Sequence, residues 1–82
     1  MAHAQERPLV LVVDDHPLVR EALVQALEGP LQDLACIAVG SAGQALQQLH
    51  GLPRLAAVLA DHRLPDGDGV SLLLEVRRLR PS

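Results

Sequence analysis

Residues Ala56 to Gly69 read A-A-V-L-A-D-H-R-L-P-D-G-D-G, and this stretch joins an apolar run to a group of turn residues. The short apolar run over 56–60 ends directly on the carboxylate of Asp61, and the next eight residues include one proline and two glycines. An apolar run of this length, bounded by turn residues, is typical of a buried strand in a parallel sheet. Open α/β sheets bind ligands at the carboxyl ends of their strands, so Asp61 is the first candidate for a functional residue.

The same pattern occurs earlier in the chain. The run P-L-V-L-V-V at 8–13 predicts a strand that ends directly on Asp14 and Asp15. The run L-A-C-I-A-V at 34–39 predicts a further strand, which ends at Gly40. Three strands are therefore expected, and two of them end on carboxylates.

Three helices are predicted between and after these strands. The first begins at Pro17 and stops at Gly29-Pro30, the second has Ser41 as its N-cap with Gln44 reaching back, and the third opens at Asp68 or Gly69 and runs to about Leu79. The residues expected on their buried faces are Leu18, Val19, Ala22, Leu23, Ala26 and Leu27 in the first, Ala42, Ala45, Leu46 and Leu49 in the second, and Val70, Leu73, Val76 or Arg77, and Leu79 in the third. The alternation β-α-β-α-β-α implies an α/β fold with a parallel sheet and right-handed crossovers.

The composition limits the class of protein. Eighty-two residues suit one domain, which we place at 8–82 after a flexible N-terminus over 1–7. The hydrophobic fraction is 49% without any Phe, Tyr or Trp, so the core must be packed from Leu, Val and Ala. A net charge of −3 provides no electrostatic footprint for nucleic acid or an anionic membrane. No apolar run approaches the roughly 20 residues of a membrane helix, and no signal peptide precedes the domain, so we expect a soluble cytoplasmic protein.

Asp14, Asp15 and Asp61 carry the chemistry. If the first and third strands are neighbours, their ends lie about 5 Å apart, and the three carboxylates share one small volume. Such carboxylates repel one another unless a cation lies among them, and hard oxygen ligands suit Mg²⁺. A carboxylate beside bound Mg²⁺ can attack a phosphoryl group and form an acyl phosphate. The alternative is that these are turn and capping residues, but two apolar runs that each end on Asp favour a site.

Two motifs resemble the receiver domains of two-component response regulators. V-V-D-D-H-P-L-V-R at 12–20 is similar to the family's acidic-pair signature, and L-A-D-H-R-L-P-D-G-D-G at 59–69 is similar to its phosphoacceptor signature. The resemblance implies a flavodoxin-like doubly wound parallel sheet. The first motif is most similar to receivers linked to helix-turn-helix output domains. A longer parent would then carry a DNA-binding domain, while this segment itself binds no nucleic acid.

The resemblance also implies roles for individual residues. Asp61 would be the phosphoacceptor, taking a phosphoryl group from a histidine kinase in a phosphorelay. Asp15 would bind Mg²⁺ directly and Asp14 mainly through water, and the backbone carbonyl of Arg63 would be a further metal ligand. The chain would act as a signalling module and not as an enzyme.

The sequence departs from the family after the third helix. The family's sheet has five strands in the order 2-1-3-4-5, and this chain supplies three, in the order 2-1-3, so it resembles a C-terminally truncated receiver. The family places a Ser or Thr and a Lys against the phosphoryl group. This chain has no Thr and no Lys, and its serines (Ser41, Ser71 and Ser82) lie elsewhere. An alternative is therefore a phosphorylation-incompetent interaction domain that binds a kinase or another receiver. A small Mg²⁺-dependent phosphohydrolase is a third reading, although the chain lacks a second acid/base pattern.

Three further expectations concern the surroundings of the site. The strand at 56–60 should be an exposed apolar edge, which invites self-association. His16 and His62 are interpreted as residues at the rim of the site. Asp66 and Asp68 are interpreted as turn and N-cap residues, whose removal should leave Mg²⁺ binding nearly intact.

Overall fold

A computed structural model describes residues 7–29, 34–52 and 55–80. The predicted order of strands and helices is confirmed, and each of the three predicted strands begins one residue later than expected. Most of the predicted flexible N-terminus (1–6) lies outside the described residues. The elements are β1 (Leu9–Val13), α1 (Pro17–Leu27), β2 (Ala35–Val39), α2 (Ala42–Gly51), β3 (Ala57–Ala60), β4 (Arg63–Leu64), β5 (Gly67–Asp68) and α3 (Gly69–Leu79).

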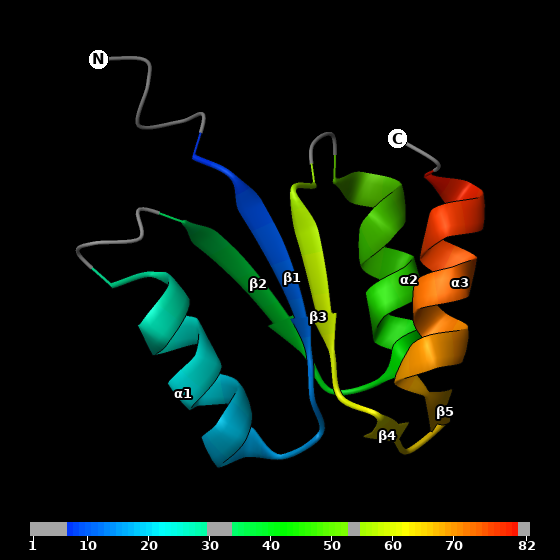
Figure 1. Ribbon diagram of the computed structural model, residues 1–82, viewed down its shortest axis with the longest axis horizontal. Coiled ribbons are helices and arrows are strands. Elements are labelled where there is room, and N and C mark those ends of the chain that lie inside the picture. The colour runs from blue at the N-terminus through cyan, green and yellow to red at the C-terminus, as the bar shows by residue number, and fades with distance from the viewer. Residues whose placement is uncertain (1–6, 30–33, 53–54, 81–82) are drawn as a thin grey trace.

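The main sheet is parallel and has the order β2-β1-β3, as the resemblance implied (Figure 1). β1 is its central strand and pairs with β2 from Leu9↔Ala35 to Val13↔Val39, and with β3 from Val10↔Ala57 to Val13↔Ala60. Residues 10–13 are all buried because both faces of this strand are covered. An uninterrupted apolar sequence is what such a two-sided position requires.

The helices form two layers around the sheet. α1 lies on one face, and α2 and α3 pack side by side on the other (Figure 1). Successive side chains of β1 point to opposite faces of the sheet. Leu11 and Val13 point into the core between the sheet and the helices α2 and α3. As expected, the core is built from Leu, Val and Ala: Leu11, Val13, Ala45, Leu49, Leu64, Leu72 and Val76.

The buried face was predicted correctly for α2. In α1, two of the six predicted residues, Leu23 and Leu27, are half-buried, and the other four are exposed. In α1 the half-buried positions are Arg20, Leu23, Val24 and Leu27, whereas Leu18 is 83% exposed. Apolar residues occur on two adjacent stripes of this helix, so periodicity alone could not choose between them. A contact of Arg20 selects the stripe that is buried. Its guanidinium donates a 3.0 Å hydrogen bond to the backbone carbonyl of Asp14, which turns the face of α1 that carries Arg20 toward the sheet.

In α3 the buried residues are Gly69, Leu72 and Val76. Val76 was expected, but Val70, Leu73 and Leu79 are exposed, so most of the predicted inner face was wrong. The cause is a close approach at Gly69, where a β-carbon would lie 2.2 Å from the backbone oxygen of Asp61. The helix therefore docks through its glycine, and the positions three and seven residues later face the core.

Charged side chains from outside α2 satisfy both ends of this helix. The Asp66 carboxylate accepts hydrogen bonds from the first two backbone N–H groups of α2. At the other end, the Arg80 guanidinium donates to the backbone carbonyls of Leu49 and Leu52. A negative group at the N-terminus and a positive group at the C-terminus both complement the helix dipole. Arg80 therefore ties the basic end of α3 to α2.

The helices in the ranges 7–29, 34–52 and 55–80 contain 11 residues at most. None of them is long and apolar enough to cross a membrane.

The contact at Gly69 predicts a large effect of a single methyl group. Gly69→Ala should lower the free energy of unfolding by roughly 1–3 kcal/mol, because the backbone at Asp61 must shift to admit the β-carbon. Gly51→Ala is the matched control, since no atom lies within 4 Å of its β-carbon position. Urea unfolding followed by circular dichroism measures both. Equal stability of the two variants would contradict the docking of α3 described here.

Candidate functional site

Three carboxylates meet at the carboxyl edge of the sheet. The ladder continues one residue past each strand, because the Asp61 N–H donates to Val13 O at 2.9 Å and the Asp14 N–H donates to Val39 O at 3.0 Å. Asp14 and Asp61 therefore lie side by side at the ends of β1 and β3. Ligand atoms of Asp14, Asp15, His16 and Asp61 all lie within 4.8 Å of one another. The structure thus brings together the three aspartates that the sequence singled out.

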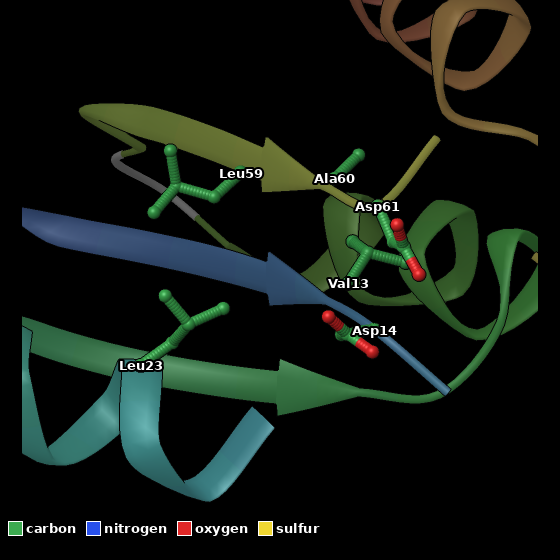
Figure 2. Close-up of a pocket in the computed structure, with 6 residues that line it drawn as sticks. All are labelled: Val13, Asp14, Leu23, Leu59, Ala60 and Asp61. Carbon is green, nitrogen blue, oxygen red and sulfur yellow. The ribbon is translucent and has the colours of Figure 1, made fainter. Parts of the chain in front are cut away.

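The three carboxylates differ in their access to solvent. Asp14 is buried, and its Oδ1 accepts a 2.9 Å hydrogen bond from the His16 N–H. The Asp15 and Asp61 side chains are 38% and 29% exposed. An open hollow of about 230 Å³ lies beside Asp14 and Asp61. Figure 2 shows these two side chains near each other, with Leu23 of α1 and Leu59 of β3 farther along the same hollow. A reactant can therefore reach Asp61 from solvent, whereas Asp14 is positioned to support it from below.

His16 is more closely involved than a rim residue. Its ring is exposed, but its Nδ1 lies 3.2 Å from Asp14 Oδ1, 3.1 Å from Asp15 Oδ1 and 3.7 Å from Asp61 Oδ2. The hydrogen bond to Asp14, followed by the charge of Asp15, raises the pKa of His16 above its usual 6.5. A protonated imidazole at this point offsets part of the repulsion among the carboxylates.

Two backbone contacts hold the loops that carry the site. The Arg20 bond to the Asp14 carbonyl fixes the β1–α1 turn, and the same guanidinium nitrogen lies 3.0 Å from where a β-carbon on Gly40 would be. The His62 carbonyl accepts a 3.0 Å hydrogen bond from the Gly69 N–H, which closes the loop after β3. His62 itself is exposed, as expected of a rim residue.

The loop after β3 is more ordered than the turn that the sequence indicated. Its residues form a small antiparallel ribbon, in which Arg63 of β4 pairs with Asp68 of β5. Arg63 lies two residues after Asp61, and its side chain is exposed. Asp68 is the N-cap of α3, as predicted, and accepts a 2.7 Å hydrogen bond from the Ser71 N–H.

Sequence reasoning missed what Arg20 and Asp66 do. Arg20 was noted only as part of a motif, and Asp66 only as a turn residue. For Asp66 one signal was present: α2 has no acidic residue in its own first turn, so its N-terminus needed an anion from elsewhere. Nothing in the sequence indicated which of the ten acidic residues would supply it.

The donor set fits a hard divalent cation. Asp14, Asp15 and Asp61 offer carboxylate oxygens within 4.8 Å of one another, and the open hollow beside Asp14 and Asp61 leaves room for water ligands. Few protein oxygens plus water is the coordination typical of Mg²⁺. His16 Nδ1 is the one nitrogen in the cluster, and a bound cation would compete with the proton on it.

A comparison with protein families identifies this arrangement. The sequence model of the response regulator receiver domain matches residues 10–82, which include both strand-end aspartate motifs. The chain belongs to the receiver domain family. It is therefore a receiver domain of two-component signalling, and its partial parallel sheet is the flavodoxin-like sheet of that family.

Curated relatives include both sensors and regulators. The sensor protein TorS of Escherichia coli is 34% identical over 73 residues, which are 89% of this chain and 8% of that protein. The hydrogenase transcriptional regulatory protein HoxA of Bradyrhizobium diazoefficiens is 40% identical over 72 residues, which are 88% of this chain and 14% of that protein. The chain thus spans a small part of these curated relatives.

Solved structures show the same fold. A sensor protein from a Polaromonas species superposes with a TM-score of 0.78 at 40% identity, over 88% of this chain and 55% of that chain. A response regulator receiver protein from Pseudomonas putida superposes with a TM-score of 0.77 at 33% identity, over 88% of this chain and 58% of that one. The chain spans just over half of each of these two structures.

The position of His16 predicts its titration. Because its partners favour the protonated ring, His16 should titrate above 6.5, and Asp14→Asn should lower its pKa by removing the hydrogen bond to a carboxylate and one negative charge. The stabilisation from the charged ring is fully present below pH 6.5 and is lost as the pH rises through the folded-state pKa. Histidine ring resonances followed by NMR against pH measure this. A His16 pKa at or below 6.5 in the wild type would contradict the arrangement.

Proposed function

We propose that this receiver domain accepts a phosphoryl group on Asp61 from a histidine kinase, as a step of a cytoplasmic phosphorelay. The observation that carries the proposal is the placement of Asp61 at the end of β3, directly beside Asp14 and facing an open hollow. Asp61 is the member of the cluster that combines strand-end placement with access from solvent. Asp14 is buried and already accepts the His16 N–H, so it is suited to support and not to attack.

The proposed step is a group transfer between two side chains. An oxygen of the Asp61 carboxylate forms a bond to phosphorus while the bond from phosphorus to the imidazole nitrogen of the kinase phosphohistidine breaks. That nitrogen keeps the electron pair and takes up a proton, and the product is an acyl phosphate on Asp61. The exposed face of the carboxylate provides the line of approach that such a displacement needs.

The same residues are proposed to hold Mg²⁺. Asp15 and Asp61 would bind the ion directly, and Asp14 mainly through water. The Arg63 backbone carbonyl would be a further protein ligand. When bound, the ion neutralises negative charge on the transferring phosphoryl oxygens. The Arg20 contact keeps the turn bearing Asp14 and Asp15 in place, and the Gly69 N–H keeps the start of the Asp61 loop in place.

We further propose that the signal is read out by a domain outside these 82 residues. Three curated relatives carry transcriptional regulation in their names, and in each the matched segment is a minor part of the protein. The D-D-H-P-L-V-R spelling at 14–20 adds to this support, because it is similar to receivers linked to helix-turn-helix domains. A DNA-binding output domain in a longer parent is accordingly our expectation, with no nucleic acid bound by this segment.

A second candidate function is a phosphorylation-incompetent interaction domain. The observation that favours it is the edge of β3, which is open in the described part of the chain and whose uncharged sequence A-V-L-A offers a surface to a strand of a kinase or another receiver. A domain of this kind would bind a kinase or another receiver without forming an acyl phosphate. Chemistry at Asp61 separates the two candidates.

The edge of the sheet supports a proposal of self-association. β3 pairs with β1 on one side, and no strand in the described part of the chain pairs with its other side. Its sequence A-V-L-A is uncharged, and Leu59 is 41% exposed. An apolar edge without charge or proline invites pairing with a second strand, and a second copy of β3 would satisfy it.

Acyl phosphate formation tests the proposed function. Incubation with a small-molecule phosphodonor and Mg²⁺ should add one phosphoryl group, measured by intact-protein mass spectrometry and removed by hydroxylamine. Asp61→Asn should abolish this modification because amide nitrogen cannot act as the nucleophile. Glu75→Gln is the matched control, since it removes one acid on α3 that is not part of the carboxylate cluster. Equal labelling of Asp61→Asn and wild type, or no labelling of either, would contradict phosphorylation at Asp61.

Sedimentation tests self-association through β3. The wild type should form dimers or larger species in the micromolar range, and Leu59→Lys should weaken association at least about tenfold, or 1.4 kcal/mol, by placing a charge at the edge. Leu18→Lys is the control, because it adds the same charge at an exposed position on α1. A monomeric wild type at all concentrations would refute this proposal.

A further inference from the structure

The first turn of α2 is satisfied by two side chains. Ala42 N–H donates to Asp66 Oδ1 and Gly43 N–H donates to Asp66 Oδ2, both at 2.8 Å. Gln44 N–H donates to the Ser41 hydroxyl at 3.2 Å, and the first intrahelical bond begins with Ala45. Asp66 therefore accepts two of the three N–H groups that precede the first intrahelical bond, although it lies 24 residues from Ala42.

The surroundings of Asp66 are shaped for this contact. A β-carbon on Gly43 would lie 3.2 Å from Asp66 Oδ2, so the glycine lets the carboxylate reach the helix. The N–H donors of Gly43 and Ala42 lower the pKa of Asp66, so the carboxylate is charged at neutral pH. A charged acceptor at a helix N-terminus makes a stronger bond than a neutral one.

Asp66 also belongs to the loop that follows the proposed phosphoacceptor. It lies in the turn between β4 and β5, five residues after Asp61. The loop is held at its start by the Asp61 N–H bond to β1, and in its middle by Leu64, which is part of the core. Within the loop, His62 bonds to Gly69 and Arg63 pairs with Asp68. The Asp66 contact adds an attachment to α2, and Arg63 lies between Asp61 and that attachment.

We propose that Asp66 is a positioning residue for the metal site: it holds the loop on α2 and so fixes the backbone at Arg63, whose carbonyl would face the ion in the proposed function. The proposal rests on the proposed function, in which that carbonyl is a metal ligand. It replaces the expectation from sequence that removal of Asp66 leaves Mg²⁺ binding nearly intact. Asp66 itself touches neither the ion nor the phosphoryl group.

Mg²⁺ titration of three proteins tests this inference. The wild type, Asp66→Ala and Ser41→Ala are followed by amide NMR of the ¹⁵N-labelled chain. Ser41→Ala is the matched control, because it removes a cap from the same helix without touching the loop. Asp66→Ala should bind Mg²⁺ about tenfold more weakly than the wild type, the low end of the loss seen when outer partners of a metal site are removed. Ser41→Ala should keep the wild-type affinity, although both variants lose stability.

The possible results separate the inference from the proposed function. Equal Mg²⁺ affinity of Asp66→Ala and wild type refutes the positioning role alone. Equal weakening in Asp66→Ala and Ser41→Ala also refutes it, because loss of a helix cap would then explain the effect. No response of the wild type to Mg²⁺ refutes the proposed metal site, and the inference with it.

A second variant covers the case in which Asp66→Ala does not fold. Asp66→Asn keeps the shape of the side chain and one acceptor oxygen but turns an N–H₂ group toward the other backbone donor. Its Mg²⁺ affinity should fall by less than the loss of about tenfold expected for Asp66→Ala. Hydrogen exchange should be faster at the Ala42 amide or at the Gly43 amide. Wild-type affinity combined with faster exchange there would refute the positioning role.

Discussion

The parallel pairing of β1 with β3 is the constraint on which the site depends. The register Val13↔Ala60 places the residues that follow, Asp14 and Asp61, at the same edge of the sheet. The pairing is stable because β1 is apolar on both faces and is covered on both by helices. A slip of one residue would turn Val58 and Ala60 away from the core and would separate the carboxylates. Packing of the apolar strands therefore fixes the geometry of the charged site.

The pairing of β1 with β3 also brings negatively charged side chains close together. Asp14, Asp15 and Asp61 come close without a basic side chain other than His16 in contact with their carboxylates among the described residues. His16 partly offsets their repulsion, and in the proposed function Mg²⁺ does so more completely. Rigidity must then come from the backbone around the cluster. Arg20 holds the backbone of the turn after β1. In our proposal, Asp66 holds the backbone of the loop after β3.

Local signals in the sequence predicted much of the fold and the site. Apolar runs located the three strands of the main sheet, and the two runs that end on Asp located the carboxylates. Ser41 and Asp68 marked two helix starts that the structure confirms. The inner faces of α1 and α3 were predicted only in part, because both helices carry apolar residues on more than one stripe and tertiary contacts choose among them. The Asp66 contact with α2 was missed for a related reason: its partners are distant in sequence and are backbone groups, which leave no residue pattern.

The metal site at the ends of β1 and β3 is tested most directly by paramagnetic broadening with Mn²⁺, which prefers oxygen ligands as Mg²⁺ does. Amide resonances of the ¹⁵N-labelled chain are recorded during addition of substoichiometric Mn²⁺. If the carboxylates at the ends of β1 and β3 form one metal site, the amides of residues 14–16 and 61–63 should broaden first, and Mg²⁺ should restore them. Broadening centred elsewhere, or spread evenly over the acidic surface, would contradict a metal site built by the pairing of these two strands.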